Sequence, residues 1–332
     1  MGAYRQKLVA HQTELTRDGK IEAALAVRTE VSALEAAMQS TVFARPGRPI
    51  RMPGANNQPG VLFIEGSKEH NESGEMPLPE LDPDRRFLRV FAYGNNYFAI
   101  DTTGAVITRP GVHQDHRPPD DMKKPVVSVG QERHRGVFLH ADGTMTATTS
   151  GYYAHLLPHL NDVIKVSGGQ NIHGALRRTG ERVPFGYDLR EKPFTAKEWL
   201  TDVVDFGVAN EWYIIKKRDG TITGVKPNGS VWDDPPEGLE NVVQIAPSSS
   251  SACLFLTREG KVIPWRATPP PAELGRVRQI RAGSQMYAAQ REDGTWLVWG
   301  HEGIAQNMNR ALNRMGTLKD LALGYRFFIG IK

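Results

Sequence analysis

The 332-residue sequence contains one cysteine, Cys253, and no long hydrophobic run. A single cysteine excludes a disulfide within the chain, so we interpret Cys253 as a buried thiol in a reducing, cytoplasmic environment. No apolar stretch approaches the ~20 residues of a membrane-spanning helix. Residues 1–20 are charged throughout and lack the apolar centre of a signal peptide. These absences predict a cytoplasmic protein that does not engage a membrane.

The sequence also lacks a strong excess of either charge, and it lacks the short motifs of common catalytic sites. Its 41 basic residues face 37 acidic ones, and the net charge of +4 gives little support for a nucleic-acid partner. Nucleophile elbows (G-x-S-x-G), phosphate-binding loops (G-x-x-x-x-G-K-[ST]) and metal-binding H-E-x-x-H helices do not occur. We therefore expect no enzymatic activity and no cofactor.

Glycine and proline are abundant, with 33 and 22 residues, and many of them belong to a repeated pattern. Each copy has a short apolar strand, a polar loop, a second apolar strand, a turn ending in glycine, and a third strand. Copies start at residues 87, 126, 163, 203, 242 and 277, and an incomplete copy starts at residue 318, so the starts lie 35 to 41 residues apart. The turn glycines are Gly104, Gly143, Gly180, Gly220, Gly260 and Gly294. Three or four antiparallel strands in about 40 residues correspond to one blade of a β-propeller.

The incomplete copy, "LKDLALGYRFFIGIK" (318–332), stops before its turn glycine. A matching third strand occurs early in the chain, because "GRPIRMPG" (47–54) aligns with "GAVITRPG" (104–111) of the first copy. We expect "GVLFIEG" (60–66) to follow it as a fourth strand. The sequence thus predicts an all-β, seven-bladed β-propeller over residues 47–332, closed by pairing of N-terminal and C-terminal strands.

The copy "VRQIRAGSQMYAAQREDGTWLVWG", which starts at residue 277, resembles the repeats of the regulator of chromosome condensation family, which also occur in β-lactamase inhibitor protein II. The resemblance covers about residues 47–332. It implies a seven-bladed ring whose loops gather on two faces. It also implies docking on a nucleotide-binding regulator or on chromatin, and the modest net charge argues against chromatin.

Residues 1–40 follow a different pattern, and we expect them to form a helical hairpin joined to the propeller by a linker at residues 41–46. Two apolar stripes with steps of three and four residues flank the turn signal Asp18-Gly19. The stripes comprise Tyr4, Leu8, His11 and Leu15, and then Ala24, Val27, Val31, Leu34 and Met38. Three ways of burying them stay open: homo-oligomerisation through residues 3–39 in a coiled-coil-like manner, packing onto the ring, or a further partner.

The loops between the first and second strands of the copies vary most in chemistry, and scaffold-held loops are where binding residues concentrate. They carry aromatic residues and arginine, the usual hot-spot types of protein interfaces. The candidate partner-binding residues are Asn95, Asn96, Tyr97, Arg133, His134, Arg135, Asn171, His173, Asn210, Glu211, Trp212, Gln285, Met286, Tyr287, Tyr325 and Arg326. The alternative is that Tyr97, Trp212 and Tyr287 pack between blades. The sequence predicts a non-enzymatic interaction scaffold whose protein partner it does not identify.

Histidines suggest a second hypothesis. His113 and His116 follow the third strand of the first copy, and His155 and His159 occupy the equivalent connection of the second copy. Four imidazoles from adjacent blades are suited to binding a metal ion, which would make the chain an enzyme or a metal-dependent binder. Solvated loop histidines are the simpler interpretation, and we expect no metal.

Overall fold

The computed structural model describes residues 59–66, 79–109, 117–131, 136–148, 157–186, 197–232 and 235–332, and before them residues 10, 13, 14 and 17. The chain divides into two units, Met1–Pro49 and Ile50–Lys332. In the first unit the four described residues are helical and exposed. The rest of the predicted hairpin and the linker at residues 41–46 lie outside the described residues, so the hairpin and its self-association stay predictions.

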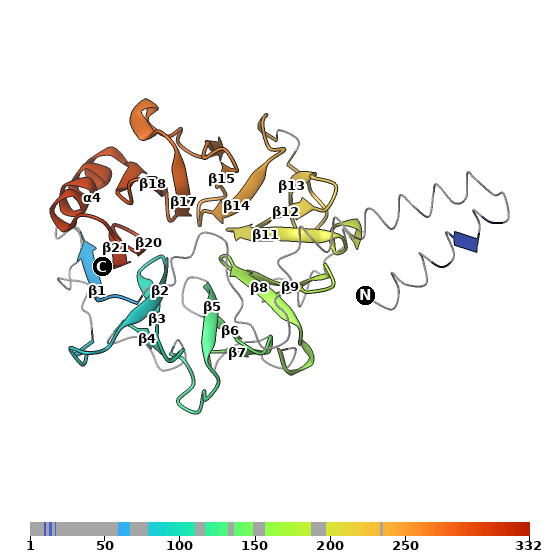
Figure 1. Ribbon diagram of the computed structural model, residues 1–332, viewed down its shortest axis with the longest axis horizontal. Coiled ribbons are helices and arrows are strands. Elements are labelled where there is room, and N and C mark those ends of the chain that lie inside the picture. The colour runs from blue at the N-terminus through green and yellow to red at the C-terminus, as the bar shows by residue number, and fades with distance from the viewer. Residues whose placement is uncertain are drawn as a thin grey trace. The chain divides into compact units, whose positions relative to one another are not determined.

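The second unit contains seven three-stranded antiparallel sheets around a common axis (Figure 1), which confirms the predicted all-β, seven-bladed propeller. We number the sheets as blades one to seven. The strands are β2 (Phe87–Tyr93), β3 (Asn96–Asp101) and β4 (Val106–Thr108) in blade one; β5 (Val126–Gln131), β6 (Gly136–His140) and β7 (Met145–Ala147) in blade two; β8 (Val163–Gly168), β9 (Ile172–Arg177) and β10 (Arg182–Gly186) in blade three; β11 (Val203–Ala209), β12 (Trp212–Lys217) and β13 (Ile222–Val225) in blade four; β14 (Val242–Pro247), β15 (Cys253–Thr257) and β16 (Val262–Trp265) in blade five; β17 (Val277–Ala282), β18 (Met286–Arg291) and β19 (Trp296–Gly300) in blade six; and β20 (Asp320–Leu323), β21 (Phe327–Ile331) and β1 (Leu62–Gly66) in blade seven. Short 3-10 helices lie at Leu157–His159, Lys197–Trp199 and Ala272–Leu274.

The repeated pattern maps directly onto these blades. The first strand of each blade lies nearest the axis, and the second strand is the middle one of its sheet (Figure 1). The predicted turn glycines lie between the second and third strands and have φ values from 83° to 93°. This left-handed backbone conformation costs glycine little and strains most other residues, which explains why glycine recurs at that point.

Blade seven combines strands from distant parts of the sequence, and Figure 1 shows β1 in blue beside β21 in red. β1 is antiparallel to β21, with Leu62 opposite Ile331 and Gly66 opposite Phe327. This corrects the predicted strand order, because the segment 60–66 takes the third position and not the fourth. The segment 47–54 lies outside the described residues. The chain approaches β21 closely just before β1, since a Cβ added at Gly60 would lie 2.1 Å from the Lys332 carbonyl oxygen.

The hydrophobic core of the described residues consists of seven clusters, one between each pair of neighbouring blades. Blades seven and one share a cluster in which Phe327 and Ile329 face Phe87 and Tyr97, all at most 1% exposed. Each blade therefore gives one side of its sheet to each neighbour. The stability of a blade depends on the blades beside it.

Helix α4 (Glu302–Met315), which the sequence analysis did not predict, covers the outer edge of blade six. The Asn309 side chain accepts a hydrogen bond from the Val298 N–H and donates one to the Val298 carbonyl, both at 2.8 Å. Met308 and Leu312 are buried in the cluster between blades six and seven. The helix thus protects the outer edge strand, as a fourth strand would.

Asp101, at the end of β3, stabilises the turn between β3 and β4 through hydrogen bonds. Its buried carboxylate accepts hydrogen bonds from the backbone N–H groups of Thr103 (2.9 Å) and Ala105 (3.0 Å), and it pairs with Arg85 at 2.7 Å. Burial raises the pKa of Asp101, but the hydrogen bonds from Thr103 and Arg85 outweigh burial and hold the pKa below its ordinary value of 3.8.

We expect the protein to lose stability in acid. A folded-state pKa below the unfolded value gives stabilisation that is complete above 3.8 and is lost as the pH falls through the folded pKa. Melting temperatures taken from about pH 7 to about pH 3 should fall at the acid end. Asp101→Asn should cost about 1–3 kcal/mol at neutral pH and reduce this acid dependence. The variant Asp121→Asn, at an exposed site, should follow the native protein throughout. A native acid dependence in Asp101→Asn would contradict the assignment.

Candidate functional site

The loops between the first and second strands gather at one end of the propeller, and we call this end the first-loop face. In blades one and four only two residues separate the strands, since Tyr93 pairs with Asn96 and Ala209 pairs with Trp212. The first of the two loop residues has a positive φ, 57° at Gly94 and 56° at Asn210. Because the turn contains only two residues, the second strand begins directly after it.

Five of the predicted partner-binding residues lie in the core and not on the first-loop face. They are at most 6% exposed, and they are Asn96, Tyr97, His173, Met286 and Tyr287. Each occupies the first or second position of a second strand. That strand is the middle one of its sheet, and both neighbouring blades cover its side chains. Of the two alternatives for Tyr97 and Tyr287, the structure supports packing between blades.

The remaining described candidates are accessible to differing degrees. Asn95, Gln285 and Tyr325 are exposed, and Asn171, Asn210, Glu211, Trp212 and Arg326 are half-buried. Arg133, His134 and Arg135 lie outside the described residues and stay predictions.

Trp212 is the outermost member of a cluster of three tryptophans between blades four and five. Its ring centroid lies 4.6 Å from that of Trp232, which lies 4.6 Å from that of Trp265. The Lys226 ammonium lies 5.1 Å from the Trp212 ring centroid and 3.2 Å from a carboxylate oxygen of Glu211. Trp232 and Trp265 are both 3% exposed, so the half-buried Trp212 ring packs against a buried aromatic neighbour.

Tyr325 and Arg326 form a second aromatic and cationic pair, in the first loop of blade seven. Tyr325 is 48% exposed, and the Arg326 guanidinium lies 5.0 Å from its ring centroid. The Tyr325 backbone N–H donates to the Gly94 carbonyl in the neighbouring loop of blade one at 2.6 Å. Bonds between blades thus hold the loop that presents the exposed ring.

Similar bonds join the first loops of blades three, four and five. The Gln170 N–H donates to the Asn210 carbonyl at 3.1 Å, and the Asn210 side-chain amide donates to the Ser251 hydroxyl at 3.0 Å. Asn210 thus acts as a bridge between two neighbouring loops. The candidate residue is structural on its buried side, and Glu211 beside it faces the Lys226 cation.

A second group of residues, which the sequence analysis missed, lies along the axis. In six blades the third residue of the first strand is polar, and in blade seven the first residue of β20 is polar; we call this set of seven residues the axial polar ring. Its members are Arg89, Ser128, Lys165, Asp205, Gln244, Gln279 and Asp320. In six blades a β-bulge immediately precedes this position. The signal in the sequence is one polar residue at a constant place in each apolar strand.

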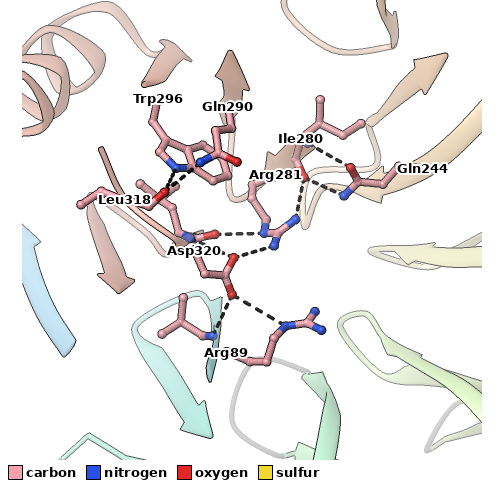
Figure 2. Close-up of polar contacts among 10 residues, drawn as sticks. Arg89, Gln244, Ile280, Arg281, Gln290, Trp296, Leu318 and Asp320 are labelled. Carbon is pink, nitrogen blue, oxygen red and sulfur yellow. Dashed lines mark hydrogen bonds and ion pairs between the residues drawn. The ribbon is translucent and has the colours of Figure 1, made fainter. Parts of the chain in front are cut away.

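Two members of the axial polar ring, Gln244 and Asp320, form hydrogen bonds with the inner-strand backbone of a neighbouring blade. In blade five, Gln244 donates to the Ile280 carbonyl at 2.9 Å and accepts from the Ile280 N–H at 3.0 Å. In blade seven, Asp320 accepts from the Val90 N–H of blade one at 3.1 Å. Arg281 of blade six donates to Asp320 at 2.6 Å and to the Leu321 carbonyl at 3.0 Å (Figure 2). A set of side chains thus replaces the strand that an inner edge lacks.

The histidine hypothesis gains no support from the described part of the chain. His159 is exposed, and His113, His116 and His155 lie outside the described residues. Among the residues that the structure describes, no group of three or more His, Cys, Asp and Glu side chains is placed to hold a metal ion.

The structure also bears on two further sequence predictions, the burial of Cys253 and the lack of a membrane-spanning helix. Cys253 is buried in β15, which confirms that its thiol is buried, and burial raises the thiol pKa. No helix in the described ranges is long and apolar enough to span a bilayer. The cytoplasmic location stays a prediction.

Comparison with known proteins identifies the fold. No protein-family model matches the chain, and no curated protein matches its sequence. Prp20p from Saccharomyces cerevisiae, whose structure is described together with its binding to Gsp1p and histones, superposes with a TM-score of 0.62 at 13% identity over 84% of this chain and 93% of Prp20p. Yeast RCC1 (Prp20) bound to Kap60 gives a TM-score of 0.60 at 12% identity over 88% of this chain and 95% of RCC1.

A plant receptor gives a weaker match. The ectodomain of the Arabidopsis thaliana receptor kinase ACR4 has a TM-score of 0.51 at 13% identity, covering 74% of this chain and 94% of the ectodomain. Identities this low show the fold alone. The fold of the chain is therefore that of the RCC1-type propellers, as the repeat resemblance predicted.

Proposed function

We propose that this chain is a protein-binding module without enzymatic activity and that it holds its partner on the first-loop face. The observation that carries the proposal is the pair of aromatic and cationic sites, Trp212 with Lys226 and Tyr325 with Arg326. Aromatic rings and arginine dominate the binding energy of protein interfaces. The solved structures of this fold that are described with Gsp1p, histones and Kap60 support a protein as the class of partner.

The rigidity of the loops supports the same proposal. Hydrogen bonds between loops of adjacent blades hold the backbone at Asn210 and Tyr325, so these residues need little reorganisation on binding. The opposite face carries the turn glycines and their short turns. Among the large hydrophobic side chains that the structure describes as exposed, Tyr325 is the aromatic one, and the others are valines such as Val243 at 40%.

Alanine substitutions on the first-loop face should weaken partner binding. A partner captured from an extract by the full chain would be purified, and its Kd measured by surface plasmon resonance. Trp212→Ala and Tyr325→Ala should each raise this Kd at least about tenfold. Arg218→Ala, at an exposed turn of the opposite face, should leave the Kd unchanged. Equal Kd values for the native chain and both aromatic variants would exclude this face as the interface.

Thermal stability separates surface residues from core residues in the same series. Tyr325→Ala should keep the native melting temperature within about 2 °C because its ring is half exposed. Tyr287→Ala should destabilise the protein by about 3–5 kcal/mol, since Tyr287 is 3% exposed and packs near Trp299. A Tyr325→Ala variant that melts as early as Tyr287→Ala would show that its effect on binding is indirect.

A further inference from the structure

A cavity of about 220 Å³ lies on the propeller axis, lined by the first strands of all seven blades. Its wall is largely apolar, with side chains such as Phe91, Phe206 and Ile245. A protein cavity of about 150 Å³ holds benzene, whereas drug-sized ligands occupy about 300–1,000 Å³. The axial cavity therefore has the size for a molecule slightly larger than benzene.

The charged groups at the cavity do not balance. Lys165 pairs with Asp205 at 2.5 Å, and Arg281 pairs with Asp320 at 2.6 Å. Arg89 is left without a carboxylate of its own, because its Nε lies 3.7 Å from the Asp320 oxygen that already accepts the Val90 N–H. Three cations of the cavity wall thus share two carboxylates, Asp205 in the wall and Asp320 beside it, which leaves an excess of one positive charge.

The Arg89 guanidinium is also short of hydrogen-bond acceptors. Its Nε is buried and has no hydrogen-bond partner among the described residues, and the side chain as a whole is 13% exposed. Figure 2 shows its two terminal amino groups pointing away from Asp320. A guanidinium presents a planar fork of donors that matches the two oxygens of a carboxylate.

Gln131, at the end of β5 in the adjacent blade, lines the same cavity. It is 6% exposed, and within the described part of the chain neither atom of its amide has a hydrogen-bond partner. Native proteins rarely leave a buried amide unpaired, so each such group requires an explanation. An occupant with oxygen acceptors would satisfy Gln131 and Arg89 together.

We propose that the axial cavity binds a small organic carboxylate, with its charged group against Arg89 and Gln131 and its apolar body against the aromatic wall. The single excess positive charge matches one carboxylate, which carries a full single negative charge at neutral pH. The apolar wall favours an acid with a hydrocarbon body. The lining comes from the first strands together with Ser249 and Gly283 of the first loops, and it includes neither Trp212 nor Tyr325 of the proposed partner interface.

Isothermal titration calorimetry on the full chain tests this assignment with benzoate, with benzamide as its uncharged analogue, and with inorganic phosphate. Benzoate should bind with a Kd of about 1 mM or tighter. Benzamide and phosphate should bind at least about tenfold more weakly. Arg89→Gln should weaken benzoate binding at least about tenfold, and Gln131→Leu about threefold. The exposed control Arg218→Gln should keep the native Kd.

Four results would overturn the proposal. They are the absence of benzoate binding at about 10 mM, equal affinities for benzoate and benzamide, tighter binding of phosphate than of benzoate, and native benzoate affinity in an Arg89→Gln protein that keeps its melting temperature. If Arg89→Gln does not fold, the Gln131→Leu variant and the benzoate and benzamide comparison on the native chain decide the question.

Discussion

A chain of residues 67–332 should melt about 10–20 °C below a chain of residues 50–332, or fail to melt cooperatively. The shorter chain lacks β1, which pairs with β21 at five positions and fills the core between blades seven and one with Leu62. Leu62 is 5% exposed, and Phe63 lies 5.9 Å from Phe328 between ring centroids. Losing the burial of these side chains and of Ile64 removes about 5 kcal/mol, a large share of the 5–15 kcal/mol that stabilises a typical domain.

Calorimetry on the two chains measures the difference, and a peptide of residues 59–66 provides the control. Added in trans, the peptide should raise the melting temperature of the shorter chain with increasing concentration, because it supplies the missing strand. A peptide of scrambled sequence should have no effect. Identical melting curves for the two chains would show that β1 does not contribute to the stability of blade seven.

The architecture was predictable because propeller blades are local structures. The strands of six blades pair with their neighbours in sequence, and each turn needs a glycine with positive φ, so both features recur at a constant period. The strand order of blade seven was not predictable in the same way. No turn connects β1 to β21, and register between strands is fixed by turns or by burial. That residues 62–66 take the third position follows from their pairing with β21, which joins segments far apart in the sequence.

Helix α4 was missed although its signal is present. Ile304, Met308, Ala311 and Leu312 follow helical spacing within a connection that otherwise resembles the polar linkers of other copies. What the sequence does not show is that Asn309 replaces a strand partner for Val298, since that function depends on where the helix packs.

The candidate site was predictable only in part, because one set of residue types serves both interfaces and cores. Tyr287 and Tyr325 occur in equivalent segments of their copies, yet Tyr287 is 3% exposed and Tyr325 is 48% exposed. The difference is a shift of position: Tyr287 lies in the second strand, whereas Tyr325 precedes it. The axial polar ring was hard to predict for a different reason. Its recurrence is visible in the sequence, but the bonds of Gln244 and Asp320 to the next blade follow only from the geometry of the ring.

The bonds made by Asp320 give the second large effect. Its side chain is 3% exposed and accepts hydrogen bonds from Arg281 (2.6 Å), the Leu321 N–H (3.0 Å) and the Val90 N–H (3.1 Å), with Arg89 at 3.7 Å. Asp320→Ala would remove the counter-charge of Arg281, which is 17% exposed, and the carboxylate that lies 3.7 Å from Arg89, which is 13% exposed. Removing one partner of a buried ion pair costs about 3–5 kcal/mol, so the free energy of unfolding should fall by this amount.

A double-mutant cycle in urea distinguishes the loss of a charge partner from the loss of packing. Arg281→Met combined with Asp320→Leu should cost less than the sum of the single changes, because an apolar pair leaves no buried charge unpaired. The exposed control Asp121→Ala should change stability by no more than about 0.5 kcal/mol. Two results would contradict this role of the Asp320 carboxylate in joining blades six, seven and one. The first is a change in the free energy of unfolding for Asp320→Ala that is as small as that of the control, and the second is a double variant whose loss of stability equals the sum of the two single losses.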